Sequence, residues 1–103
     1  MDMQRSGPKN FPADERRIVE FGERLRLARL RRKFSTELVA TRAGVSRTTL
    51  YKIERGDPAV TLAAYLRVLA IYGLTSDIEK LAVDDVLGRR LQDLELAPRK
   101  DRP

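Results

Sequence analysis

The sequence predicts an all-α domain of five or six helices. Apolar residues recur at intervals of three and four along most of the chain, which is the period of a helix and not of a strand. Between the two ends, proline occurs only at Pro58 and glycines stand singly. Serine or threonine precedes several of the apolar runs, in the position of a helix cap. These features favour a bundle of short helices.

The first helix is expected over residues 14–32. An apolar stripe advances along it in steps of three and four, and most of its arginines point outward. The stripe consists of Ile18, Phe21, Leu25 and Ala28. Leu27 and Leu30 form a smaller apolar pair outside this stripe, available to the N-terminal segment, to Leu94 or to a partner.

Two short helices follow. Ser35 is placed to cap a helix that ends just before Gly44, and Ser46 is placed to cap a helix that ends just before Gly56. Glycine is suited to both stops because it adopts a positive φ without the steric cost of a β-carbon. The pair is too small to bury a core alone, yet its spacing is that of a helix-turn-helix unit.

A fourth helix is expected between its cap, Thr61, and its stop, Gly73. Its inward stripe is Leu62, Tyr65, Leu66, Leu69 and Tyr72. A second apolar line runs beside it and consists of Ala64, Val68 and Ile71. A small monomer would leave this second line in water, so we expect it to form a dimer or partner interface. Burial beneath the C-terminal helices of the same chain is the alternative.

Two further helices are expected after Gly73. The Ser-x-x-Glu spacing at residues 76–79 predicts a capping box and a short helix that runs to about Val83. A sixth helix is expected to start at Asp84 or Asp85, with Gly88 as a weak point. Its apolar residues are Val86, Leu87, Leu91 and Leu94, of which Leu91 and Leu94 are added to the expected dimer or partner interface.

The composition excludes many functions. The 103 residues include no cysteine and no histidine, which removes disulfides, cysteine or histidine catalysis and the usual zinc sites. No glycine-rich phosphate loop is present, so we expect no enzyme, no cofactor and no metal. No uncharged stretch approaches the roughly 18 residues of a membrane span. Because the start is polar, we expect a soluble cytoplasmic protein.

Charge is concentrated in the first half of the chain. Residues 1–56 carry a net charge of +7, whereas residues 57–103 carry −1. This asymmetry favours a surface that binds a polyanion, followed by a module with another role. We therefore expect a flexible arm over 1–12, a helix-turn-helix domain over 13–75, a helical assembly extension over 76–96 and a flexible basic tail over 97–103.

The stretch 34–56, FSTELVATRAGVSRTTLYKIERG, resembles the helix-turn-helix of the Xre/Cro repressors, and the likeness covers about residues 21–74. The resemblance implies a lambda-repressor-like fold whose second motif helix enters the major groove of operator DNA. Arg29 and Glu54 match positions that form an internal ion pair in that family. Thr36 stands where the family usually has a glutamine. The expected DNA-binding residues are Ser35, Thr36, Ser46, Arg47, Thr48, Tyr51 and Lys52.

The chemistry of these residue types agrees with DNA recognition. Arginine donates two hydrogen bonds to guanine, threonine offers a hydroxyl and a methyl group, and lysine reaches a phosphate or guanine. Ser35 and Thr36 stand at a helix start, where free amides favour a phosphate oxygen. The basic run Arg24, Arg26, Arg31, Arg32 and Lys33 could either flank the DNA backbone or form a solvated face.

A narrower resemblance begins at Glu54. The segment ERGDPAVTLAAYLRVLAIYGL, followed by Asp77, Leu81, Asp85, Gly88 and Leu91, is similar to the HipB-like antitoxins of Hip-type toxin-antitoxin modules. The resemblance implies a homodimeric repressor of its own operon that also holds a Hip-type kinase toxin. A stand-alone Xre-family regulator and a helix-turn-helix protein-interaction module stay open as alternatives. RNA binding is a third, although the aromatic residues form no stacking platform.

Overall fold

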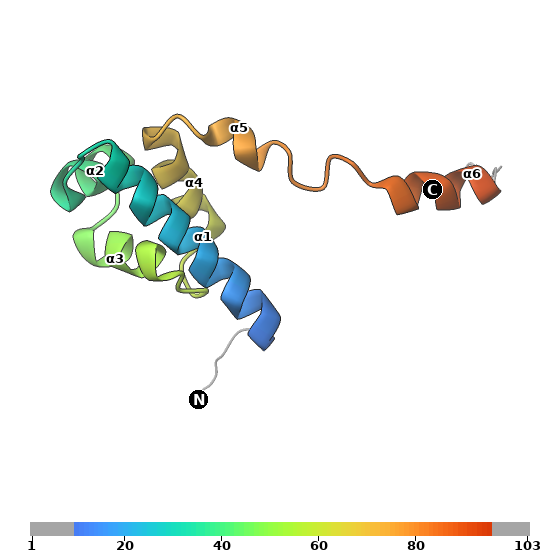
Figure 1. The fold of residues 1–103 in the computed structure, drawn as a ribbon, viewed down its shortest axis with the longest axis horizontal. Helices are drawn as coiled ribbons and strands as arrows, with labels where there is room; N and C mark the ends of the chain where they lie inside the picture. Colours follow the sequence, from blue (N-terminus) through green and yellow to red (C-terminus); the bar gives the residue numbers. More distant parts are fainter. Residues whose placement is uncertain (1–9, 96–103) are drawn as a thin grey trace.

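The computed structural model describes residues 10–95, and within this range the chain forms six helices and no strand (Figure 1). The all-α prediction is therefore confirmed. The helices are α1 (Pro12–Arg31), α2 (Thr36–Ala43), α3 (Arg47–Arg55), α4 (Leu62–Ile71), α5 (Thr75–Ile78) and α6 (Val86–Glu95). None of them is long and apolar enough to cross a membrane.

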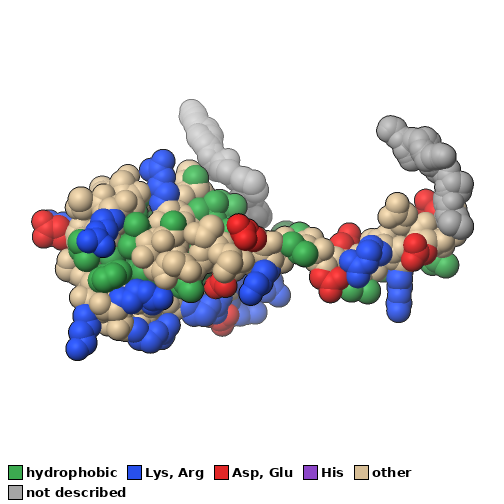
Figure 2. All heavy atoms as spheres, turned by 90° about the horizontal axis from the view of Figure 1, so that it is seen from above, with side chains coloured by type: hydrophobic (Ala, Val, Ile, Leu, Met, Phe, Trp, Pro, Cys, Tyr) green, Lys and Arg blue, Asp and Glu red, His purple; other side chains and the backbone are tan. Residues whose placement is uncertain are grey.

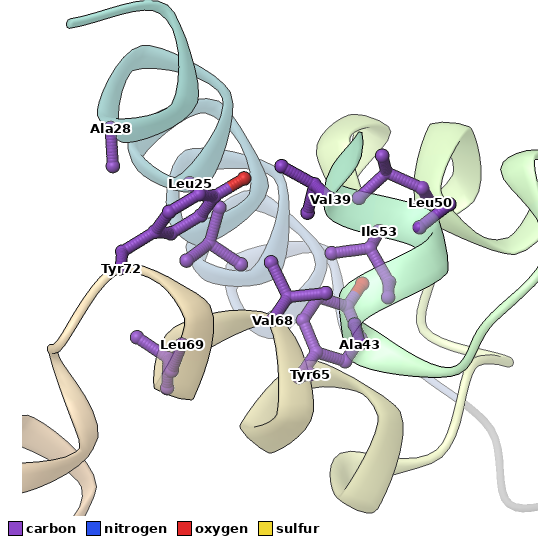
Figure 3. Packing of buried hydrophobic residues seen from close by; sticks show 11 residues of the cluster. Leu25, Ala28, Val39, Ala43, Leu50, Ile53, Tyr65, Val68, Leu69 and Tyr72 are labelled. Atoms are coloured by element: carbon purple, nitrogen blue, oxygen red, sulfur yellow. The ribbon is translucent and has the colours of Figure 1, made fainter. Parts of the chain in front are cut away.

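The first four helices enclose one hydrophobic core. The long helix α1 packs on α3, and α2 packs on both α3 and α4. Side chains from all four helices converge at the centre (Figure 3). The fully buried residues at that centre are Leu25, Val39, Leu50, Ile53 and Val68. At the edge of the core, the ring of Phe21 stacks on that of Tyr65 with 5.4 Å between centroids, which ties α1 to α4.

The predicted serine and threonine caps at the starts of α2 and α4 are formed. Ser35 Oγ accepts a hydrogen bond from Leu38 N at 3.0 Å, and Thr61 Oγ1 accepts one from Ala64 N at 3.2 Å. Gly44 ends α2 with a φ of +71°, which is the left-handed conformation expected of it. The chain thus enters and leaves each short helix at the residues that the sequence indicates.

Helix α4 differs from the prediction in the face that it buries. Val68 is 0% exposed and lies in the core, whereas Leu62 is 61% exposed. The prediction of Val68 as a dimer or partner interface residue is therefore wrong. The buried face follows the helical steps Tyr65, Val68, Leu69 and Tyr72, which are positions i, i+3, i+4 and i+7. Ala64 and Ile71 are half-buried against the same core.

The predicted capping box at 76–79 is not formed, and α5 is only four residues long. After α4, the backbone closes a tight turn in which Leu74 N donates to Leu69 O at 3.0 Å and Gly73 N donates to Ala70 O at 3.1 Å. The next helix begins directly after this turn, which places Ser76 inside α5 and not at its cap. The expected extension to Val83 is wrong as well, because α5 ends at Ile78.

Helix α6 begins after Asp85, as predicted, and Asp85 Oδ1 accepts a hydrogen bond from Gly88 N at 2.9 Å. It stands apart from the other helices at the end of an extended linker (Figure 1). At the other end of the domain, α1 starts at Pro12, one residue inside the predicted N-terminal arm. The rest of that arm up to residue 9, and the predicted basic tail 97–103, lie outside the described residues.

Candidate nucleic-acid interface

Helix α3 has one buried face and one exposed polar face. Leu50, Ile53 and Glu54 are buried. The exposed face contains four of the residues predicted to bind DNA, Arg47, Thr48, Tyr51 and Lys52, together with Arg55. Tyr51 is 47% exposed, whereas Tyr65 and Tyr72 are buried in the core. The structure thus brings together on one side of α3 the side chains that direct base contact requires.

Three of the hydroxyl residues of the predicted site, Ser35, Thr36 and Ser46, lie at the starts of α2 and α3. Ser46 Oγ accepts a hydrogen bond from Thr49 N at 3.0 Å, and its hydroxyl donates to Thr49 Oγ1 at 3.0 Å. The serine side chains are therefore used as caps, and the remaining amides of the first turns stay available to an anion. Ser35 caps α2 in the same way, while Thr36 is half-buried in its first turn.

An ion pair joins α1 to the end of α3. Arg29 Nε donates to Glu54 Oε2 at 2.7 Å and Arg29 Nη2 donates to Glu54 Oε1 at 3.1 Å. The two side chains are only 12% and 7% exposed. The hydrogen bond with Glu54 raises the pKa of Arg29 above its ordinary value, although desolvation acts in the opposite direction. Arg29 Nη1 also donates to Phe34 O at 3.2 Å, so one guanidinium fixes α1, the start of α2 and α3 relative to each other.

The ion pair also decides the charge that α3 presents. Glu54 is the only carboxylate on α3, and it is turned inward to Arg29. The outer face therefore carries only positive charges, those of Arg47, Lys52 and Arg55. Lys and Arg side chains, drawn in blue, are spread over the surface of the domain in Figure 2. This is the electrostatic pattern that a DNA backbone attracts.

Two members of the basic run in the second half of α1 and directly after it have structural contacts. Arg32 Nη1 donates to Ala28 O at 3.0 Å, Nη2 donates to Tyr72 O at 2.9 Å, and the guanidinium lies 5.5 Å from the centroid of the Tyr72 ring. Arg32 thereby ties the end of α1 to the end of α4. Arg26 pairs with Glu23 at 2.9 Å on α1. Arg32 is therefore a structural link between two helices, whereas Arg26, whose ion pair is exposed, stays open to both interpretations, a DNA-backbone contact or a solvated face.

Two exposed arginines near the motif, Arg42 and Arg55, were not among the residues predicted to bind DNA. Arg42 lies in the last turn of α2 and Arg55 lies in the last turn of α3. A signal for Arg55 was present, because it follows Lys52 by three residues and Tyr51 by four, which are the spacings of neighbours on one face of a helix. Within residues 10–95, no group of acidic side chains is arranged to hold a metal ion.

The fold and the exposed face of α3 define a helix-turn-helix DNA-binding domain. The helix-turn-helix domain family matches residues 20–82, which is more than half of the chain, and the protein belongs to this family. Membership indicates DNA binding and a role in transcriptional regulation. None of the curated proteins compared with this chain matches it.

Proposed function

We propose that the protein is a sequence-specific transcriptional repressor that acts in the cytoplasm as a homodimer on double-stranded operator DNA. The observation that carries the proposal is the outer face of α3, which is polar and exposed and carries only positive charge because Glu54 is withdrawn into its pair with Arg29. A major groove admits a helix of this kind, and base edges there distinguish all four base pairs. No catalysis is part of this function.

Each residue of the interface has a distinct proposed role. Arg47, in the first turn of α3, donates a bidentate pair to guanine, and Thr48 beside it contacts a thymine methyl group or an acceptor. Lys52, one turn further, reaches a phosphate or a guanine, and Tyr51 packs against the sugar–phosphate backbone. Ser35, Thr36 and Ser46 place the first amides of α2 and α3 against phosphate oxygens.

Binding of the Arg47→Ala variant to operator DNA tests this proposal. The DNA used is the region upstream of the gene that encodes this protein. Loss of a bidentate contact removes about 1 to 3 kcal/mol of discrimination between bases. We expect the variant to bind all members of a panel of mutated operators with similar, weak and salt-sensitive affinity, as measured by fluorescence anisotropy. Arg16→Ala, which removes the same charge from an exposed position on α1, is the control and is expected to keep the preference.

Two results would contradict the proposal. Unchanged relative affinities of Arg47→Ala across the panel would show that Arg47 reads no base. Absence of any salt-dependent DNA binding by the natural protein would instead favour a protein-interaction module that keeps the fold without its DNA role.

We further propose that the regulator is the antitoxin of a Hip-type kinase module. The support is the sequence similarity that begins at Glu54, together with the exposed apolar pair Leu27 and Leu30 on α1, which DNA reading does not use. These two side chains offer a kinase-fold toxin a small apolar contact. The toxin would thus bind to α1 and leave α2 and α3 available for DNA.

Co-expression with the product of the neighbouring reading frame tests the antitoxin proposal. We expect a kinase-fold product that arrests growth when expressed alone and that copurifies with this protein. Leu30→Asp should abolish copurification and leave operator binding unchanged, whereas Arg47→Ala should do the reverse. A neighbouring frame without a kinase fold, or a kinase that does not bind, would leave a stand-alone Xre-family regulator.

A further inference from the structure

An apolar groove runs along α1 on the side formed with α4 and α5. It consists of two adjoining hollows of ≈ 390 and ≈ 280 Å³ that share Phe21 and Leu62. Ile78 and Leu81 line one end, and Val60 lines the other. No lining residue belongs to α2 or α3, so an occupant of this groove would not displace any residue of the proposed DNA interface.

Helix α6 carries an apolar line without a covering surface among the described residues. The line consists of Leu87, Leu91 and Leu94, at positions i, i+4 and i+7, and Leu91 and Leu94 are 54% and 82% exposed. Hydrophobic side chains, drawn in green, are visible along the projecting segment in Figure 2. An isolated helix of ten residues is marginal in water. Helix α6 therefore needs a surface that buries this line.

We propose that α6 of one copy docks into the groove of a second copy, and that the second copy returns its own α6 to the first. The inference rests on the dimer of the proposed function and names the surface that forms it. Because each copy carries both the helix and the groove, two copies related by a two-fold axis satisfy both at once.

The position of α6 favours exchange between copies. The radius of gyration of 18.3 Å exceeds the roughly 13 Å of a compact chain of this length, since α6 projects away from the domain (Figure 1). Leu81 itself lines the groove, so an α6 that returned to its own groove would have only residues 82–85 in which to reverse. Asp85 already caps α6 within that segment. A second copy imposes no such reversal.

The length and the charges of α6 also fit the groove of a second copy. Ten helical residues span about 15 Å, enough to lay three leucines along adjoining hollows. The groove carries Arg24 of α1 and the acidic Asp77, and α6 carries Arg90 and Glu95 on the two flanks of its apolar line. Opposite charges on the two surfaces favour one orientation of the helix in the groove.

Cross-linking between introduced cysteines tests the exchange, because the chain has no cysteine of its own. Leu62→Cys places a thiol in the groove and Leu91→Cys places one on the apolar line of α6. The two full-length variants, one of them tagged, are mixed, allowed to exchange and treated with a short bismaleimide. We expect a cross-linked species containing one tagged and one untagged chain, and far less of it when Gln92→Cys, on another face of α6, replaces Leu91→Cys.

The double variant Leu62→Cys/Leu91→Cys separates the alternatives. A product linked within one chain at high dilution, with no mixed species, would show that α6 folds back on its own domain and would overturn the proposal. Absence of both products would overturn it as well.

A charge on the apolar line of α6 separates the test of the exchange from the test of DNA recognition. Leu91→Asp is expected to weaken dimerisation at least about tenfold by light scattering, since a carboxylate on the apolar line opposes burial. The variant should keep the base preference of α3 on a single half-site. A Leu91→Asp dimer of unchanged strength would overturn the exchange alone, whereas a natural protein that dimerises but shows no base preference would overturn the proposed function alone.

Discussion

Gly22 and Gly56 face each other where α1 crosses the end of α3. A Cβ atom placed on Gly22 would lie 2.6 Å from Gly56 N, and one placed on Gly56 would lie 2.6 Å from Val19 N. Both obstacles are backbone atoms, which cannot rotate away. The two glycines therefore permit a close approach of helix backbones that sets the position of the recognition helix α3.

Gly22→Ala tests whether this close approach controls α3. In an exposed helix interior the change would stabilise α1 by about 1 kcal/mol, because alanine has the higher helix propensity. Here we expect the opposite sign, a loss of about 2 to 3 kcal/mol, since overpacking against backbone forces α3 to shift. Chemical denaturation measures the loss, and weaker operator binding of the folded fraction should accompany it. A variant that gains stability would show that α1 and α3 do not meet at Gly22.

Arg29→Met tests the ion pair that holds the other side of the same crossing. Because Glu54 would stay buried without its partner, we expect a loss of about 3 kcal/mol in the free energy of unfolding. The double variant Arg29→Met/Glu54→Leu should recover most of that loss, since it leaves no uncompensated buried charge. Equal stability of the single and double variants, measured by urea unfolding, would indicate that the pair is not desolvated.

The helix-turn-helix could be predicted from the sequence because its determinants are local. Ser35, Ser46, Gly44 and Gly56 act on backbone within a few residues of themselves, so caps and stops reveal the helices directly. The exposed face of α3 follows from the positions of Leu50 and Ile53 by helical periodicity alone.

Contacts between distant elements could not be predicted in the same way. Whether Val68 or Leu62 points into the core depends on how α4 is rotated against α2, and both are apolar residues at helical spacing. Arg32 is one of several arginines in or next to α1, and only its contacts with the carbonyl and ring of Tyr72, forty residues later, distinguish it. The close approach of Gly22 to Gly56 likewise depends on the tertiary crossing.

Tyr65 and Tyr72 are two buried tyrosines that differ in whether the hydroxyl group has a hydrogen-bond partner. Comparing them measures how much that hydrogen bond contributes to stability. Both are 4% exposed, but the Tyr65 hydroxyl donates to Asp57 O at 2.8 Å, whereas the Tyr72 hydroxyl has no partner within residues 10–95. We expect Tyr65→Phe to cost about 1 kcal/mol and Tyr72→Phe to be neutral or stabilising. Thermal unfolding compares them, and a larger loss for Tyr72→Phe would reveal a hydrogen bond that the structure does not contain.

The raised pKa values of the same two tyrosines lead us to expect a loss of folding stability at high pH. Burial raises the pKa of Tyr65 to about 12, with a smaller effect from Asp57, and burial raises the pKa of Tyr72 to about 12, with a smaller effect from Glu54. In the unfolded chain both ionise near pH 10, so the folded state holds its protons more tightly. The contribution of the two protonated hydroxyls to the free energy of unfolding is therefore complete below pH 10 and decreases between pH 10 and pH 12. Tyr65→Phe should show a shallower decrease in melting temperature over that range than the natural protein.

Val68→Glu is expected to unfold the domain rather than to release folded monomers. Val68 is fully buried between α4 and the rest of the core, where a carboxylate has neither water nor a partner, at a cost of several kcal/mol. Ala63→Glu, which places the same charge on the exposed side of α4, is the matched control and should keep the helical circular dichroism and the melting temperature within a few degrees. If Val68→Glu instead stays folded and becomes monomeric, then Val68 lies at a surface between copies and the packing of α4 differs from that shown in Figure 3.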